Sequence, residues 1–468
     1  MDNTKQNDNH IINKLKQTKI CKKILEHEKI NKLITNKFWK ELAKNSVWAF
    51  LGDGIAAVIN LVILMILIKL IGDNATGLFI LSQTYTLILD VILNIQSWKS
   101  VIYYGQHAIV KNRIDELDSY VKLGAIIDVF TAILGGIIAI VAVPFVAKYL
   151  NWNHEMILAT QIFSATIFSH LAGTSIAILR ISNKFNLVAV QKVVSALLKI
   201  LAILTLFLFK QNISLLTVVI IYALTEFLGN LLLVYFAIKE YNKKYDFKRI
   251  IYSKLPNNTK EFLKFTLWGS VSEILDIPVN YLDVFIVSIL GNDKVVIYKV
   301  FKQCVGMISK VTTPIQQSIL PQFSELVAKE EREKAYNVVK KIRNVTLKYM
   351  GPLIVLVSIT SPIWLKILFA KQFAENWYVL FIYLIIQTVA LSYTAIHPLF
   401  VSLGKVKEDA IITLFANGIY LIFAYMIVNI LGLLGMVFAF MVQAFLMISL
   451  KDIIIKKNIK KIRNTKSS

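Results

Sequence analysis

The sequence predicts an all-α integral membrane protein with about 12 transmembrane helices arranged in two six-helix lobes. Three observations predict this fold. The chain is 56% hydrophobic, only 17% charged and has a mean hydropathy of +0.61, which is more apolar than a soluble core requires. Apolar stretches long enough to span a bilayer recur along the chain. A turn reading GDNATGLF at residues 72–79 returns as GNDKVVIY at residues 291–298, so the second lobe repeats the first.

Each predicted span is a run of roughly 20 or more mostly apolar residues. A basic segment (1–43) is expected to precede the spans on the cytoplasmic side, its residues 20–38 forming an amphipathic helix on the membrane surface. The N-terminal lobe (44–240) has candidate spans at 46–70, 77–104, 119–149, 155–179, 187–209 and 213–238. A charged linker (241–258) leads to the C-terminal lobe (259–453), with spans at 262–290, 295–324, 343–369, 376–402, 408–429 and 431–450. A basic tail (454–468) follows.

The net charge of +23 is explained by topology. Lysine and arginine crowd both ends of the chain and every second loop, and the intervening loops hold few of them. This alternation follows the positive-inside rule and places both termini in the cytoplasm of a bacterial cell. The basic segments lack interleaved aromatic residues, so no nucleic-acid partner is expected. The basic pairs in the loops include Lys111 and Arg113, Arg180 and Lys184, Lys248 and Arg249, Lys340 and Lys341, and Lys405 and Lys407.

The internal repeat is parallel. Gly72 and Gly291 differ by 219 positions, and SNKFN at 182–186 precedes LGKVK at 403–407 by 221. Because each half has an even number of spans, both halves start on the same side of the membrane, related by an axis along its normal. A transport path is therefore expected between the lobes.

The sequence does not indicate an enzyme. It has no phosphate-binding P-loop, no H-E-x-x-H and no nucleophile elbow, and its extracytoplasmic loops are short. His170 and His397 lack ligand-like spacing, and Cys21 and Cys304 are expected far apart, so neither a metal site nor a disulfide is predicted.

Charged residues inside predicted spans mark the candidate site, because each costs roughly 2.5–3.5 kcal/mol at a helix centre. The span 262–290 presents an acidic face and the span 295–324 a basic one. Counted from Gly291, Asp283 is level with Lys299 or Lys302, and Glu273 with Lys310. These charges either neutralise one another as internal pairs or leave Lys302 available to an anionic substrate. The two faces comprise Glu273, Asp276, Asn280 and Asp283, and Lys299, Lys302, Gln303, Lys310 and Gln317.

The second predicted span carries the matching polar stripe in the first lobe, because subtracting the repeat offset from Lys302 gives Gln83. We expect both stripes to line one cavity between the lobes. Asp128, Lys199 and Glu226 are expected to find partners within the bundle or to reach its surface, and topology alone accounts for Arg180 and Lys184. The stripe of the second span is Gln83, Thr86, Asp90, Asn94 and Ser97.

From residue 38 to about 450 the chain resembles the bacterial polysaccharide biosynthesis proteins. These are the O-antigen and capsule repeat-unit flippases of the multidrug/oligosaccharidyl-lipid/polysaccharide exporter superfamily. The resemblance is carried by the segment from FWKELAKNSVW to LSQTYTLIL, by AILRISNKFNLVAVQ, by YLDVFIVSILGNDKVVIYKVFKQ and by TTPIQQSILPQFSEL. Val296 departs from the pattern, since the first repeat has Gly77 there.

The resemblance implies a MATE-like exporter architecture in the cytoplasmic membrane. It also implies alternating-access translocation of an undecaprenyl-pyrophosphate-linked oligosaccharide, made and used by partner glycosyltransferases and a polymerase. Lys302, Lys299 and Lys310 are then the candidates for the pyrophosphate or acidic sugars, and Gln83, Asn94 and Gln317 for sugar hydroxyls. Asp90 and Asp283 are the candidates for coupling to a proton or sodium ion; no cofactor is expected. The alternatives are a cation-coupled multidrug exporter, which the basic stripe disfavours, and a membrane polymerase, which the short loops disfavour.

Overall fold

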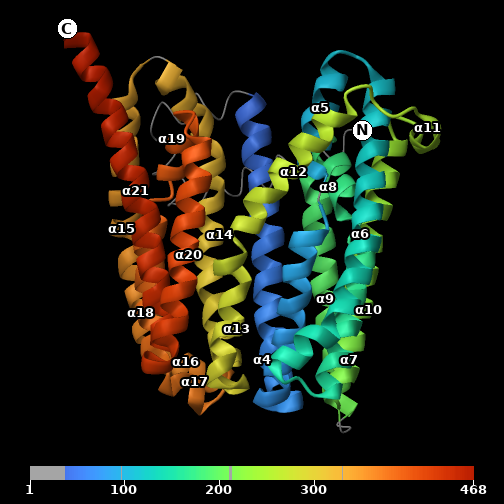
Figure 1. Ribbon diagram of the computed structural model, residues 1–468, viewed down its shortest axis with the longest axis vertical. Helices are drawn as coiled ribbons and strands as arrows, with labels where there is room; N and C mark the ends of the chain where they lie inside the picture. Colours follow the sequence, from blue (N-terminus) through green and yellow to red (C-terminus); the bar gives the residue numbers. More distant parts are fainter. Residues whose placement is uncertain (1–36, 96, 210–212, 329, 468) are drawn as a thin grey trace, which may run out of the picture.

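The computed structural model describes residues 37–467 except 96, 210–212 and 329, and all regular secondary structure among them is helical (Figure 1). The basic segment 1–36, with most of its predicted surface helix, lies outside the described residues. Nine helices of the described chain are long and apolar enough to cross a membrane. One of them, Val47–Leu93, holds two of the predicted spans joined by a turn.

The first lobe begins with α4 (Lys37–Leu93), which turns back on itself at Gly72. Its second half continues into α5 (Trp98–Val110) after a break that includes Asn94, Ile95 and Ser97. α6 (Ile114–Leu150) follows, and the next crossing consists of α7 (His154–Ala165), η1 (Thr166–Ser169) and α8 (Ala172–Ile181). α9 (Phe185–Phe209) and α10 (Leu215–Asn242) complete the lobe, and the short α11 (Phe247–Tyr252) lies in the linker.

The second lobe begins with a broken crossing built from α12 (Thr259–Leu275), the π-helix η2 (Pro278–Leu282), α13 (Asp283–Val287) and the 3-10 helix η3 (Ser288–Leu290). α14 (Asn292–Ala328) returns through the bundle. The remaining elements are α15 (Arg332–Ile359), the short α16 (Ser361–Leu368) and α17 (Lys371–Glu375), α18 (Trp377–Ser392) with α19 (Ile396–Ser402), α20 (Val406–Leu431) and α21 (Leu433–Ser467).

Two predicted spans fall outside the nine helices, for physical reasons. The crossing from α12 to η3 is divided into short pieces, and α14 carries several lysines along its length. Both line the region between the lobes, where charge and irregular backbone are tolerated away from lipid.

The backbone confirms the repeat. A helix ends in a left-handed residue at corresponding positions of the two lobes, with offsets of 219, 221 and 218 residues. Such backbone favours glycine and asparagine. The pairs are Gly72 (φ 79°) with Gly291 (φ 107°), Asn183 (φ 57°) with Gly404 (φ 74°), and Asn112 (φ 53°) with Glu330 (φ 59°).

The lobes are joined at one end of the molecule and packed separately at the other. We call the end with the turns at Gly72 and Gly291 the turn end, and the end reached by the C-terminus of α21 the tail end (Figure 1). One apolar core near the turn end contains residues of both lobes, including Leu67 and Phe79 of α4 and Phe301 of α14. Two further cores lie towards the tail end, one in each lobe, although Phe262 of α12 joins that of the first.

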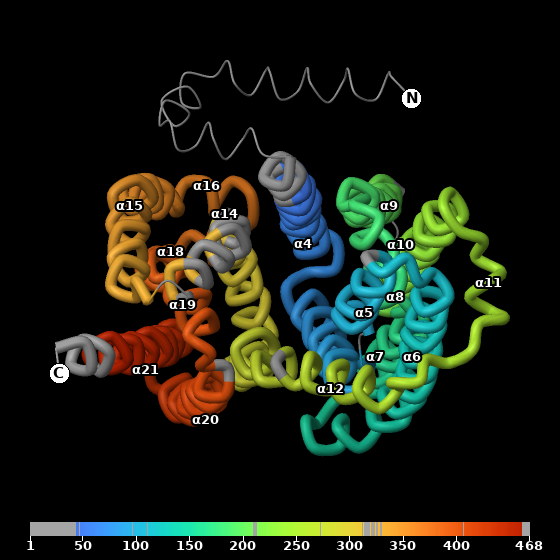
Figure 2. The backbone as a smooth tube through the Cα atoms, turned by 90° about the horizontal axis from the view of Figure 1, so that it is seen from above, coloured from blue at the N-terminus to red at the C-terminus, as the bar shows by residue number. Residues whose placement is uncertain are grey.

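Seen along its long axis, the molecule divides into two groups of helices, with α4, α12 and α14 where they meet (Figure 2). At the turn end, Gly77 packs directly on Asn292, where an added Cβ would lie 2.5 Å from the Asn292 carbonyl oxygen. The departure at Val296 does not prevent close packing, because Val296 is fully buried.

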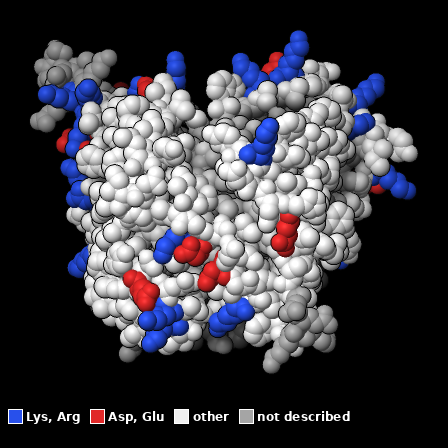
Figure 3. Space-filling model, turned by 60° about the horizontal axis from the view of Figure 1, so that its bottom comes forward, with Lys and Arg blue, Asp and Glu red and all other residues white. Residues whose placement is uncertain are grey.

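The outer surface suits a bilayer. Large apolar side chains such as Phe145, Leu208 and Met426 are exposed on it, and the lysine and arginine side chains seen in Figure 3 gather mainly towards its edges. This is the distribution expected of a lipid-facing band with charged ends.

Candidate functional site

Lys302 of α14 is bound to the broken crossing of the second lobe. Pro278 has no N–H group, and the π-helix that it begins leaves backbone carbonyls free. The Lys302 ammonium donates to the carbonyls of Val279 (2.8 Å) and Asn280 (2.9 Å) and to the carboxylate of Asp283. All three of its N–H donors are therefore engaged within the protein.

Asp283 is fully buried at this point. Its carboxylate also accepts hydrogen bonds from the Tyr298 hydroxyl (2.7 Å) and from the backbone N–H of Val284 (2.9 Å). The sequence allowed Asp283 to pair with either Lys299 or Lys302, and the structure pairs it with Lys302.

The predicted pair of Glu273 with Lys310 is wrong. Glu273 pairs across the lobes with Lys99 of α5 (2.9 Å), which also donates to the Gly269 carbonyl (3.2 Å). The side chain of Lys310 is exposed and forms no ion pair with the residues that the structure describes. The lysines of the basic stripe of α14 therefore differ in their surroundings: Lys302 is paired, Lys310 is exposed, and Lys299 lies in a cavity.

Lys299 lines a cavity of about 150 Å³ between the lobes. Its polar walls come from Asn60 and Gln83 of α4 and from Lys299 and Gln303 of α14, and Tyr222 of α10 closes one side. Within the described residues, the Lys299 ammonium has neither an ion pair nor a hydrogen bond. The side-chain oxygens of Asn60 and Gln303 are buried and also lack a hydrogen-bond partner.

This cavity can bind a polar anion. An ammonium group without a carboxylate attracts negative charge in a site of low dielectric constant. The two unpaired amide oxygens accept hydrogen bonds, which suits hydroxyl groups. The structure thus brings together Lys299 and Gln83, two of the residues predicted from the sequence, and adds Asn60 and Gln303.

Asn94 and Asp90 lie inside the first lobe instead. Asp90 pairs with His170 Nδ1 (3.0 Å) and accepts a hydrogen bond from the Asn94 amide (3.0 Å). The Asn94 oxygen accepts from Thr131 (3.1 Å), and its amide also donates to the His170 carbonyl (3.2 Å). The side chain of Gln317 lies outside the described residues.

Two breaks in the helices of the first lobe are capped by one carboxylate. Asp128 accepts hydrogen bonds from the backbone N–H groups of Ser97 (3.1 Å) and Thr174 (2.6 Å) and from the Thr174 hydroxyl (2.7 Å). Ser97 and Thr174 stand beside the breaks before α5 and α8, so Asp128 satisfies groups that a continuous helix would have paired internally.

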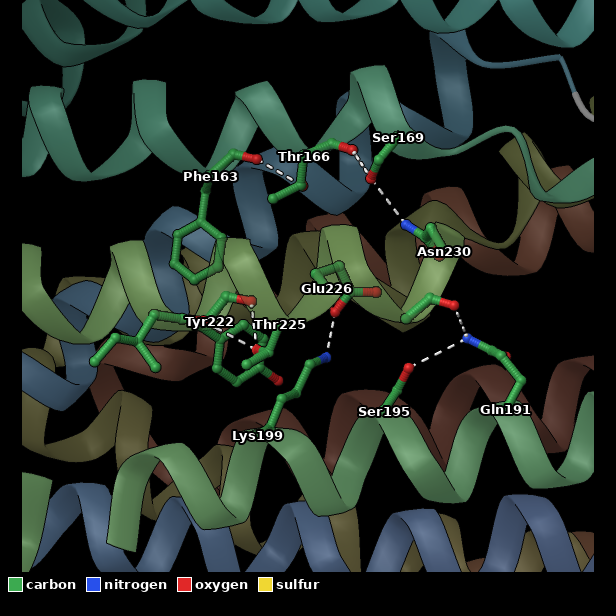
Figure 4. A network of polar contacts seen from close by, with 12 residues as sticks. Phe163, Thr166, Ser169, Gln191, Ser195, Lys199, Tyr222, Thr225, Glu226 and Asn230 are labelled. Atoms are coloured by element: carbon green, nitrogen blue, oxygen red, sulfur yellow. Dashed lines mark hydrogen bonds and ion pairs between the residues drawn. The ribbon is translucent and has the colours of Figure 1, made fainter. Parts of the chain in front are cut away.

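Lys199 and Glu226 find partners within the bundle, one of the two outcomes expected for them, and each is the partner of the other (Figure 4). Lys199 of α9 contacts the carboxylate of Glu226 of α10, and its ammonium lies 4.3 Å from the centre of the Tyr222 ring. Nearby, Asn230 donates to Ser169 (2.9 Å). Tyr222 therefore lies between the Lys299 cavity and a buried ionic network.

Sequence reasoning does not single out Asn60 or His170 as site residues. Asp53, which shares α4 with Asn60, pairs with Lys192 (2.5 Å). His170 lies 80 residues from Asp90 in the chain, and no spacing rule joins them. No three or more His, Cys, Asp or Glu side chains of the described chain form a group that could hold a metal ion.

Comparison with known proteins gives two kinds of match. A family model described as "Polysaccharide biosynthesis protein" matches residues 42–327, more than half of the chain. A Shigella flexneri protein named "Putative O-antigen transporter" is 25% identical over 420 residues, covering 86% of this chain and 95% of its own. Inner membrane protein YghQ of Escherichia coli K12 is 24% identical over 164 residues, which span 34% of this chain and less than half (45%) of that protein.

A solved structure shares the fold. The inward-facing conformation of a multidrug resistance MATE family transporter of the MOP superfamily superposes with a TM-score of 0.71, covering 89% of this chain and 99% of the other. The two sequences are 14% identical, so this likeness describes the architecture of two six-helix lobes.

Proposed function

The chain belongs to the polysaccharide biosynthesis protein family of bacterial inner-membrane transporters, and from this premise we propose that it is a flippase for lipid-linked glycans. Its cargo is an undecaprenyl-pyrophosphate-linked oligosaccharide repeat unit of a surface polysaccharide. The observation that carries the proposal is the Lys299 cavity, where an unpaired cation and unpaired hydrogen-bond acceptors face each other between the lobes.

Each part of this cargo has a chemical counterpart. The pyrophosphate requires a cation, and the Lys299 ammonium is not occupied by a protein carboxylate. Sugar hydroxyls donate to Asn60 and Gln303, and Gln83 adds an amide. The lipid tail stays in the bilayer beside the apolar outer helices. The cavity accommodates one charged group at a time, and the remaining sugars extend along the space between the lobes.

Transport follows from the unequal packing of the two ends. The shared apolar core closes the turn end, and the separate cores leave the lobes freer to part at the tail end. The positive-inside distribution assigns the tail end to the cytoplasm, so this arrangement receives cargo from the inner leaflet. Rocking of the lobes then exposes the cavity on the other side.

The remaining candidates take different roles in this proposal. Lys310, exposed on α14, offers a second contact for pyrophosphate or acidic sugars. Lys302 holds the broken crossing. Of the two acids proposed for ion coupling, Asp90 is favoured over Asp283, because its partner His170 is an imidazole that can exchange a proton with it, whereas Lys302 and Tyr298 fix Asp283. Lys199 and Glu226 are the other charged groups near His170, and Tyr281 of η2 is a further titratable group near Asp90.

The cavity does not favour a multidrug exporter. An organic cation needs an unpaired acid or an aromatic cage, but no Asp or Glu is among the described residues that line the cavity. The free charge in the cavity is positive.

The test is complementation of a deletion strain. Surface polysaccharide and undecaprenyl-linked intermediates are measured with the wild type, Lys299→Gln and a matched control, Lys294→Gln, which removes a lysine of α14 outside the cavity. We expect the deletion and Lys299→Gln to lose polymer and accumulate lipid-linked repeat units, and the control to behave as the wild type. Normal polysaccharide in the deletion strain would overturn the proposal.

A further inference from the structure

Arg180, at the end of α8, is a cation without an acid. Its guanidinium carbon lies 4.6 Å from the centre of the Trp98 ring and 5.9 Å from that of Phe185. Its Nε atom is buried and has no hydrogen-bond partner. Within the described chain, no acceptor takes a hydrogen bond from the rest of the guanidinium. The positive-inside rule explains why an arginine follows α8 but not why it is held between rings with its donors unused.

The neighbouring lysines are all paired. Lys184, four residues further on, lies 3.6 Å from Glu240, and Lys192 of α9 pairs with Asp53 of α4. Lys99, next to Trp98, pairs with Glu273 of the other lobe. Asp53 is near enough to attract Arg180, but its carboxylate is bonded to Lys192. A partly buried guanidinium with no acceptor is costly, so a ligand that supplies oxygen atoms would find it ready.

Arg180 lies on the tail-end side of the Lys299 cavity. Gly52 packs directly on Ala189, one turn along α9 from Phe185, which places Arg180 beside this part of α4. Asn60, in the cavity wall, is seven residues after Asp53, so the two levels are about 10 Å apart along α4. Because α8 ends towards the tail end, Arg180 lies nearer that end than the cavity does.

We propose that Arg180, held by Trp98 and Phe185, is a loading site for the phosphate groups of the cargo, which bind there before reaching Lys299. This inference rests on the proposed function and adds a second anion site to it. The guanidinium forms two parallel hydrogen bonds to phosphate oxygens, which an ammonium cannot do. The contacts with the aromatic rings hold the guanidinium in place and leave its charge unneutralised.

The experiment measures binding to the purified full-length protein in phosphatidylcholine nanodiscs. The probes are undecaprenyl pyrophosphate and, separately, phosphatidylglycerol, which offers a phosphate from an ordinary lipid headgroup. The proteins are the wild type, Arg180→Gln, Arg180→Lys, the cavity variant Lys299→Gln and the matched control Lys184→Gln. Thermal unfolding shows whether each variant is folded. If Arg180→Gln does not fold, Arg180→Lys serves as the test variant.

We expect Arg180→Gln to raise the Kd for undecaprenyl pyrophosphate about tenfold or more, as the loss of a charged hydrogen bond predicts. Arg180→Lys should show a smaller increase, and Lys184→Gln none. Unchanged affinity in both Arg180 variants, with weaker binding in Lys299→Gln, would overturn the loading site alone. An effect on phosphatidylglycerol without one on undecaprenyl pyrophosphate would also overturn it. Failure of the wild type to bind undecaprenyl pyrophosphate would instead count against the proposed function.

Discussion

Replacing Lys302 with methionine tests whether this lysine holds the broken crossing together. The change leaves the fully buried carboxylate of Asp283 without a counter-ion and the carbonyls of Val279 and Asn280 without a donor. Breaking a buried ion pair costs about 3–5 kcal/mol, and each orphaned carbonyl adds about 1 kcal/mol. We therefore expect the free energy of unfolding to fall by about 5–7 kcal/mol.

The double variant Lys302→Met with Asp283→Asn separates the charge from the backbone. It removes the uncompensated carboxylate and leaves only the two carbonyls, so the expected loss is about 2 kcal/mol. Unfolding is followed by circular dichroism as sodium dodecyl sulfate is added to protein in mixed micelles. The reasoning is refuted if Lys302→Met lies within about 1 kcal/mol of the wild type, or if the double variant is no more stable than the single one.

Three further predictions concern the first lobe and its contact with the second. Gly77→Leu should lower the free energy of unfolding by about 1–3 kcal/mol, because the added side chain overpacks the contact with Asn292. It should also lower several-fold the yield of a disulfide between cysteines introduced at positions 74 and 292, whose native side chains are hydrogen-bonded; an unchanged yield would contradict the prediction. Asp128→Ala should lower the free energy of unfolding by about 3 kcal/mol, because two backbone N–H groups lose their acceptor, and a loss below about 1 kcal/mol in the same titration would show that water replaces the cap. His170→Gln should abolish the dependence of transport on a pH gradient in proteoliposomes, while transport at equal pH on both sides stays within about twofold of the wild type. Retained dependence on the gradient would exclude His170 from coupling.

The fold could largely be predicted from the sequence, because hydropathy and repeated turns are local signals. Gly72 and Gly291 mark the same left-handed helix end in both lobes. Each lies between two apolar runs, so the reversal of the chain there can be predicted from neighbouring residues alone. Hydropathy alone is a weaker guide to a crossing where polar side chains replace apolar ones, as along α14.

The pairing of charges could be predicted only in part. Counting from Gly291 at 1.5 Å per residue puts Asp283 level with Lys299, but η3 is a 3-10 helix with a rise of about 2.0 Å. The three residues of η3 place Asp283 about 1.5 Å deeper than the count gives, in the direction of Lys302, its actual partner. The contacts of Lys99 with Glu273 and of His170 with Asp90 join residues 174 and 80 positions apart. No local pattern marks such pairs, since they depend on how whole helices pack.

The contact between Gly77 and Asn292 bears on the energetics of the cell. A membrane that stores an ion gradient tolerates a carrier for large polar cargo only if no continuous file of water crosses it. At the turn end this insulation is provided by the shared apolar core and by Gly77, which packs directly on the backbone and Cβ of Asn292. Leakage is thus prevented by close packing, and a larger residue at position 77 would expose the cell to dissipation of its gradient as well as to slower transport.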